Sequence, residues 1–185
     1  MDNTSSFIRI HNNALEDDVC DYLINLYEKN SDLWERVDNN RKPNFTQFNL
    51  TLHSNKSEEI SYINNYIISR FSIFKDDYIN FFGQNYFPLD YAYEEFRIKK
   101  YNNDGNDEFE YHVDVMDHVS SKRFVAFLWY LNDVEIGGET CFWDYKIHPK
   151  KGNLIIFPPT WMFPHCGKEP ISNPKYIMST YLHYQ

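Results

Sequence analysis

The residues best suited to chemistry in this sequence are a histidine and an aspartate separated by one position, His112 and Asp114. In an extended segment the side chains of residues i and i+2 point to the same face, so this imidazole and this carboxylate can bind one metal ion together. The motif is weak alone, because His-x-Asp is common by chance. A third ligand, His165, follows the apolar run 153–157 further along the chain. Three such ligands on one side of a metal ion would leave its remaining positions open for reactants.

A second candidate for chemistry is Lys175, which begins the last predicted strand. A lysine whose side chain is directed into the interior of a barrel costs free energy unless an anion neutralises it. We therefore expect Lys175 to bind a carboxylate or a phosphate.

Two amphipathic helices are predicted in the first half of the chain. Asn13 and Glu16 have the spacing of a capping box, and apolar residues then recur at three- and four-residue steps through about residue 30. The same cap spacing at Asn55 and Glu58 precedes a second helix that ends near Gly83. The apolar stripes consist of Leu15, Val19, Tyr22, Leu23 and Leu26 in the first helix, and of Ile60, Ile63, Ile67, Phe71 and Phe74 in the second.

Short strands dominate the remainder of the sequence. They are predicted at residues 45–53, 91–101, 123–131, 139–143, 153–157 and 175–184. Helices followed by many short strands favour an α+β, mainly β fold, in which a barrel or sandwich of strands is supported by helices on one side. We find no repeat and no linker, so residues 1–185 are expected to form a single domain. The polar loops 38–44 and 102–107 are candidate substrate lids.

The composition restricts the classes of partner. With 18 basic and 27 acidic residues the formal net charge is -9, so no nucleic acid is expected as a partner. No apolar run approaches the ~20 residues that cross a bilayer, and the amino-terminal residues do not form a secretory signal. The three cysteines, Cys20, Cys141 and Cys166, form no Cys-x-x-Cys pair and fit a reducing compartment. We expect a soluble, cytoplasmic protein without a membrane partner.

Four motifs are spread along nearly the whole chain. They are the opening 10–15, Tyr101 with a polar loop before His112 and Asp114, the strand 123–131 continuing into Gly137-Gly138-Glu139-Thr140, and the segment 149–157 before His165. Together they resemble the 2-oxoglutarate and Fe(II)-dependent dioxygenases, specifically the prolyl 4-hydroxylase-like branch. That resemblance implies a double-stranded β-helix, or jelly roll. Helical support would then span about residues 1–85, and the jelly-roll core about residues 86–185.

The resemblance also implies the cofactors and their ligands. Fe(II) would be held by His112, Asp114 and His165, with 2-oxoglutarate and O2 as cosubstrates and ascorbate as an optional reductant. The far carboxylate of 2-oxoglutarate would pair with Lys175. The hydroxyl of Tyr101 would reach the same carboxylate. Thr140 would line that pocket.

The reaction implied by the resemblance is hydroxylation of a prolyl residue in a peptide or protein, with release of succinate and CO2. Asp114 favours hydroxylation over halogenation, because related halogenases carry a small residue in its place. Candidate substrate contacts are Arg123, Tyr181 and Trp129. Aromatic walls around the metal could be formed by Trp129, Phe142, Trp143, Trp161 and Phe163, although an ordinary position in the core is favoured for each.

The substrate stays open, because several positions depart from the family pattern. Ala126 stands where relatives often have threonine. After Gly137-Gly138-Glu139-Thr140, this chain has Cys141-Phe142-Trp143 in place of the usual Phe-Pro. A second interpretation keeps the chemistry but makes the substrate a free amino acid or a small metabolite. A third is a jelly-roll binding module without turnover. The oligomeric state and the choice of lid loop also stay open.

Overall fold

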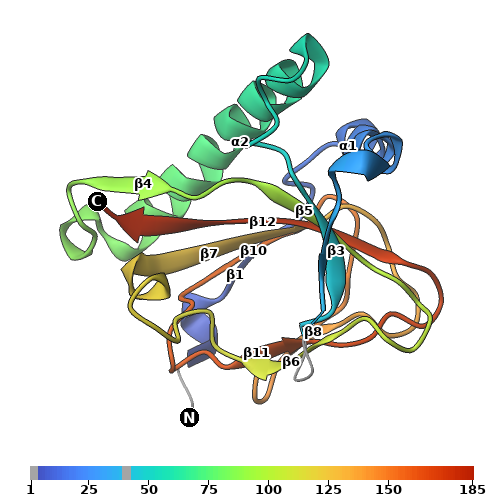
Figure 1. The fold of residues 1–185 in the computed structure, drawn as a ribbon. Helices are drawn as coiled ribbons and strands as arrows, with labels where there is room; N and C mark the ends of the chain where they lie inside the picture. Colours follow the sequence, from blue (N-terminus) through green and yellow to red (C-terminus); the bar gives the residue numbers. More distant parts are fainter. Residues whose placement is uncertain (1–3, 39–42) are drawn as a thin grey trace.

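The structure is a computed structural model that describes residues 4–38 and 43–185. It is mainly β, with two α-helices and two sheets in which all strand pairs are antiparallel. Figure 1 shows three layers: the helices lie on one side of the larger sheet, and the smaller sheet lies on the other. Of the predicted lid 38–44, residues 39–42 lie outside the described residues.

The larger sheet forms the middle layer. Its strand order is β1 (Arg9–His11), β10 (Leu154–Phe157), β7 (Arg123–Tyr130), β12 (Lys175–Tyr184), β5 (Arg97–Tyr101), β3 (Phe45–Asn49) and β2 (Glu35–Val37), with β4 (Tyr91–Tyr93) paired to β12. The longest strand, β12, lies in the centre and pairs with β7 along most of its length. The start and the end of β12 match the prediction.

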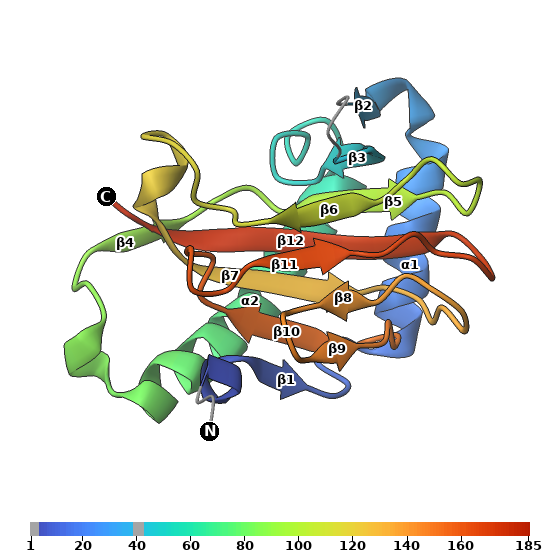
Figure 2. The same cartoon turned by 90° about the horizontal axis from the view of Figure 1, so that it is seen from below.

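The smaller sheet lies against the inner face of the larger one, as Figure 2 shows from below. Its order is β6 (Phe109–His112), β11 (His165–Gly167), β8 (Thr140–Cys141) and β9 (Lys146–Ile147). None of its four strands exceeds four residues. Such short strands leave little periodicity to read. β9 and β11, like β1 and β2 of the larger sheet, were not predicted, and of β6 only the extended backbone at His112 was expected.

Two predicted strands are interrupted for identifiable reasons. The run 45–53 is a strand only as far as Asn49, whose side-chain oxygen accepts a hydrogen bond from the backbone N–H of Leu52 (2.9 Å) and so forms a turn. The run 91–101 is divided into β4 and β5. Between them the backbone N–H of Phe96 donates to the hydroxyl of Thr51 (2.9 Å) instead of to a strand neighbour.

Both predicted helices are present, but their caps differ from the prediction. The first, α1 (Asp17–Lys29), begins after Glu16, and Asn13 lies outside it with a left-handed φ of 54°. The backbone N–H of Asn13 donates to the side chain of Asn153 (3.2 Å), which is far away in sequence. The second, α2 (Glu58–Phe82), is capped by Ser57 and ends at Gly83. Four 3-10 helices complete the described part: Thr4–Phe7, Ser31–Leu33, Gln84–Tyr86 and Ser120–Lys122.

Two hydrophobic clusters lie on the two faces of the larger sheet. The first packs α1 and α2 against the sheet and includes Leu23, Ile67 and Trp129. The second fills the space between the sheets and includes Phe45, Tyr101 and Phe157. Neither helix is long and apolar enough to span a membrane, judged over the described residues.

Candidate metal centre

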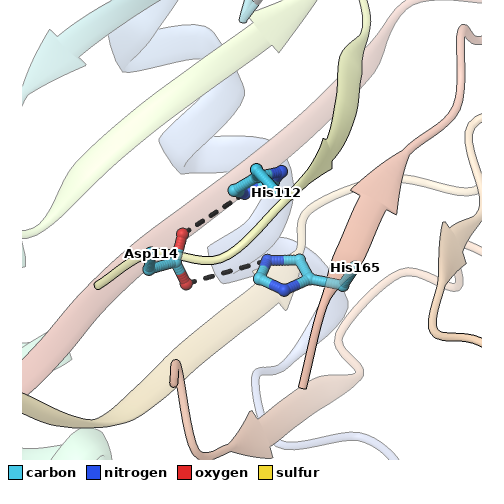
Figure 3. Close-up of side chains that lie close together, drawn as sticks. All are labelled: His112, Asp114 and His165. Carbon is cyan, nitrogen blue, oxygen red and sulfur yellow. Dashed lines mark ion pairs between the residues drawn. The ribbon is translucent and has the colours of Figure 1, made fainter. Parts of the chain in front are cut away.

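The three predicted ligands converge between the two sheets. His112 ends β6 and His165 begins β11, and the two residues are direct partners in the antiparallel pair. Asp114 follows β6, and its backbone N–H donates to the carbonyl of Pro159 (3.1 Å), which fixes the turn after the strand. In Figure 3 the carboxylate of Asp114 faces both imidazoles, with one oxygen toward each.

The distances suit a shared metal ion. Oδ1 of Asp114 lies 3.3 Å from Nε2 of His112, and Oδ2 lies 3.7 Å from Nε2 of His165. One ligand atom from each residue can be chosen so that all lie within 4.8 Å of one another. The side chains are largely buried, with exposed fractions of 15%, 8% and 7% for His112, Asp114 and His165.

Hydrogen bonds prepare both histidines to bind through Nε2. Nδ1 of His112 lies 2.7 Å from the carbonyl oxygen of Glu110, and Nδ1 of His165 lies 3.0 Å from that of Phe163. A carbonyl only accepts, so each Nδ1 donates its proton and each Nε2 keeps a free lone pair in the neutral ring.

The charges of the site also suit a cation. Burial lowers the pKa of His165, which favours the neutral imidazole that a metal requires. Burial alone would raise the pKa of Asp114. His165 and His112 stabilise the carboxylate whenever their Nε2 atoms carry a proton, and this outweighs the effect of burial, so the pKa of Asp114 is lowered. Two neutral nitrogens and one carboxylate form the donor set that suits non-haem Fe(II).

Aromatic rings enclose the histidines. Phe109 stacks on His112, with ring centroids 3.4 Å apart and an interplanar angle of 6°. Phe157 and Phe142 approach His165 with centroid distances of 4.8 and 5.6 Å. These rings exclude water from one side of the site.

Lys175 lies at the other end of the same cavity and is 2% exposed. Its ammonium donates to the carbonyl oxygens of Gly138 (3.0 Å) and Lys168 (3.4 Å), and it forms no ion pair with any carboxylate among the described residues. Burial lowers the pKa of Lys175 to about 8. A carboxylate that binds beside a buried ammonium with only neutral partners would stabilise its charge.

Tyr101 and Thr140 lie beside Lys175 and line the cavity. Tyr101 is the strand partner of Lys175, whose ammonium lies 4.5 Å from the centre of the Tyr101 ring. The hydroxyl of Thr140 accepts a hydrogen bond from the hydroxyl of Tyr130 (2.6 Å). The structure thus brings together all six residues that were predicted for the metal and for 2-oxoglutarate.

Two of the three candidate substrate contacts also lie near the metal ligands. Arg123 forms hydrogen bonds to both carboxylate oxygens of Glu94 (2.6 and 2.8 Å), and it donates to the carbonyl oxygen of Asp114 (3.3 Å). Its guanidinium lies 4.1 Å from the centre of the Tyr181 ring. Both residues line an outer groove that adjoins the metal ligands.

The third candidate, Trp129, does not lie near the metal ligands. It is fully buried in the cluster beneath the helices, because alternation along β7 directs it away from the cavity. Trp143 and Trp161 are 76% and 77% exposed and do not line the cavity either. Phe142 and Phe163 are buried between the sheets. Among cavity residues, the prediction missed Phe109, Phe157 and Lys99. Lys99 could have been found, because it lies two positions before Tyr101 in one strand.

Comparison with known proteins identifies the class. The model of the 2OG-Fe(II) oxygenase superfamily matches residues 96–183, which contain the three candidate ligands and Lys175. This segment is a 2OG-Fe(II) oxygenase domain, and the protein is a 2-oxoglutarate-dependent dioxygenase whose cofactor is Fe(II) and whose cosubstrates are 2-oxoglutarate and O2.

Solved structures with a similar fold include several prolyl hydroxylases. A viral collagen prolyl hydroxylase from Paramecium Bursaria Chlorella virus-1, in complex with 2-oxoglutarate, is 22% identical with a TM-score of 0.71 over 97% of each chain. A prolyl hydroxylase from Trichoplax adhaerens, in complex with a hypoxia inducible factor peptide fragment, is 20% identical with a TM-score of 0.75 over 98% of this chain and 85% of that one. A Pseudomonas putida prolyl-4-hydroxylase is 14% identical with a TM-score of 0.71 over 97% and 93%. No curated protein matches the chain by sequence.

Proposed function

We propose that this dioxygenase hydroxylates a prolyl residue in a peptide or protein and releases succinate and CO2. The observation that carries the proposal is one cavity with two ends: the cluster of His112, Asp114 and His165 at one end, and the buried ammonium of Lys175 at the other. 2-Oxoglutarate has a metal-chelating group at one end and a carboxylate at the other, and would match both.

His112, Asp114 and His165 would hold the iron through two Nε2 atoms and a carboxylate oxygen. Bound there, Fe(II) would supply the site at which O2 and 2-oxoglutarate react to hydroxylate the substrate. The carbonyls of Glu110 and Phe163 would keep the imidazoles in the tautomer that binds metal. The rings of Phe109 and Phe157 would keep water away from the reaction.

Lys175 would pair with the far carboxylate of 2-oxoglutarate. The bond would combine charge with a hydrogen bond in a buried place, where both are strongest. Tyr101 and Thr140 would donate hydroxyl hydrogen bonds to the same group. Ascorbate would act only as an added reductant.

The prolyl substrate is supported by the fold. The three similar solved structures named above are prolyl hydroxylases, and the one from Trichoplax adhaerens is in complex with a peptide fragment. The outer groove beside Arg123 and Tyr181 offers a surface on which an extended peptide would lie. Trp129 is not proposed as a substrate contact.

The same proposal covers the architecture and the location. The two facing sheets would form the double-stranded β-helix of this enzyme class over about residues 86–185, and residues 1–85 would support it within a single domain. The three cysteines are free and buried, and we propose a reducing cytoplasm as the site of action.

The test combines spectroscopy with product analysis. Under anaerobic conditions, Fe(II) and 2-oxoglutarate should produce a weak visible charge-transfer band. In air, the enzyme should add one oxygen atom to proline in a panel of proline-containing peptides, as measured by mass spectrometry. A free amino acid as the sole hydroxylated compound would favour the small-substrate interpretation. If the protein binds iron but produces neither the band nor succinate, the interpretation as a binding module without turnover would be favoured.

A further inference from the structure

Lys99 is a cation at the junction between the metal cavity and the outer groove. It lies on β5, where its strand partners are Ile177 on β12 and Gln47 on β3. Because side chains alternate along a strand, Lys99 shares the inner face with Arg97 and Tyr101. It lines both the cavity that contains the ligand cluster and the groove that leads outward.

The other two cations of the groove already have carboxylate partners. Arg123 binds Glu94 through two hydrogen bonds, and Arg97 pairs with Glu95. In the part of the chain that the structure describes, the ammonium of Lys99 forms no hydrogen bond and no ion pair. It lies over the ring of Phe45 instead, 5.1 Å from the ring centre. Residues 39–42, Asn-Asn-Arg-Lys, contain no carboxylate that could serve.

A half-buried ammonium without an anion is an unfavourable arrangement. Burial lowers the pKa of Lys99 to about 8. Asp114 attracts Lys99 more than any other carboxylate does, but its two oxygens face His112 and His165. A molecule that enters the groove with an anion would therefore stabilise Lys99.

We infer that Lys99 binds a carboxylate of the substrate and so selects prolyl substrates that carry a negative charge next to the reacting residue. This inference rests on the proposed function. Two sources fit the chemistry: an acidic side chain beside the target proline, or the free carboxylate of a proline at a chain end. Lys175 serves the far carboxylate of 2-oxoglutarate at the opposite end of the cavity, so Lys99 is available to the substrate.

The first measurement needs no variant. Peptides that differ only in Glu, Gln or Lys beside proline are compared by kcat/KM, and we expect the Glu peptide to be preferred over the Gln peptide by about 10-fold, the usual order for a hydrogen-bonded charge pair. Peptides that end in proline are compared as free acid and as amide, alongside free L-proline and its amide. Preference for Glu assigns the side-chain source, and preference for the free acid assigns the chain-end source. Equal kcat/KM for all charged and neutral forms would overturn the inference.

The second measurement assigns the preference to one residue. Lys99→Met should remove the preference through a higher substrate KM, with the cosubstrate KM unchanged, and Lys99→Arg should retain most of it. Lys100→Met is the matched control, because Lys100 follows on the same strand but faces α1, where it pairs with Glu28 (2.7 Å). If Lys99→Met raises only the cosubstrate KM, Lys99 binds 2-oxoglutarate and the inference fails.

Binding measurements separate this inference from the proposed function. Labelled peptides are titrated anaerobically into the enzyme with Fe(II) and 2-oxoglutarate, and fluorescence anisotropy is recorded. Tighter binding of acidic peptides, lost in Lys99→Met, would support the role of Lys99 even if no proline gained oxygen. Proline hydroxylation without any charge preference would support the proposed function and refute the role of Lys99.

Discussion

His112 and His165 lie directly opposite each other across β6 and β11, with ring centroids 4.3 Å apart. Side chains at such paired positions are near neighbours on one face of a sheet. A slip of one residue would turn one of the two histidines to the outer face and separate the pair. The register of this short strand pair therefore determines whether a metal site forms at all.

Removal of one ligand should abolish turnover. For His165→Ala we expect succinate formation to fall by at least about 100-fold, because even partners outside the ligand set typically contribute about 10–100-fold. Bound iron should fall in parallel, measured by metal analysis after gel filtration. His148→Ala is the control, since that side chain is 68% exposed. Undiminished succinate formation in His165→Ala would refute the ligand assignment.

Removal of the buried ammonium should weaken cosubstrate binding. For Lys175→Met we expect the cosubstrate KM to rise by roughly 10–100-fold, the usual range for a charged hydrogen bond. The kcat at saturating 2-oxoglutarate should change far less. Lys168→Met serves as control, because only the backbone carbonyl of Lys168 contacts the site. A cosubstrate KM equal to that of the native enzyme would exclude Lys175 as the anchor.

The same lysine should leave a signature in the pH dependence of stability. Its pKa is about 8 in the folded protein and about 10.4 in an unfolded chain. Between these values the unfolded chain holds more protons, so the free energy of unfolding rises with pH. In metal-free protein without cosubstrate, the Tm of the native chain minus that of Lys175→Met should increase from pH 8 to about pH 10. A constant difference would contradict the lowered pKa.

Loss of Arg123 should weaken the iron site indirectly. Arg123 positions Asp114 by donating to its carbonyl oxygen, and Glu94 holds Arg123 in place. For Arg123→Met we expect Fe(II) affinity to fall by about 10-fold, in line with other partners of metal ligands. Fe(II) titration measures the effect, with Arg70→Met on α2 as control. An unchanged iron Kd would restrict Arg123 to the substrate groove.

Trp129 and Tyr181 should respond in opposite ways to substitution. Trp129→Phe alters the helix-facing core and should lower the free energy of unfolding by about 1–3 kcal/mol, with substrate KM unchanged. Tyr181→Leu alters the groove and should raise substrate KM. Denaturant unfolding and steady-state kinetics on both variants test this. If Trp129→Phe changes the substrate KM and leaves the free energy of unfolding unchanged, Trp129 is a substrate contact.

The sequence predicts most of what depends on local pattern. The shared face of His112 and Asp114 follows from the period of two on extended backbone, and the limits of β12 follow from its run of apolar and aromatic residues. The face occupied by Trp129 does not follow, because β7 is apolar on both sides and alternation alone does not tell which side faces the helices. The cap at Asn13 fails for a related reason: its backbone is held by Asn153, far away in sequence.

Alternate residues on the strands of the larger sheet face the helices on one side and the cavity on the other. Along β12, Met178 and Leu182 pack under the helices, while Ile177, Ser179 and Tyr181 line the cavity or the groove. Positions that line the cavity and the groove are thereby separated from positions that hold the scaffold, although they adjoin in sequence. Natural or directed evolution could therefore change the substrate of this enzyme by exchanging every second residue of β5 and β12. The thermal stability of the protein would then change little.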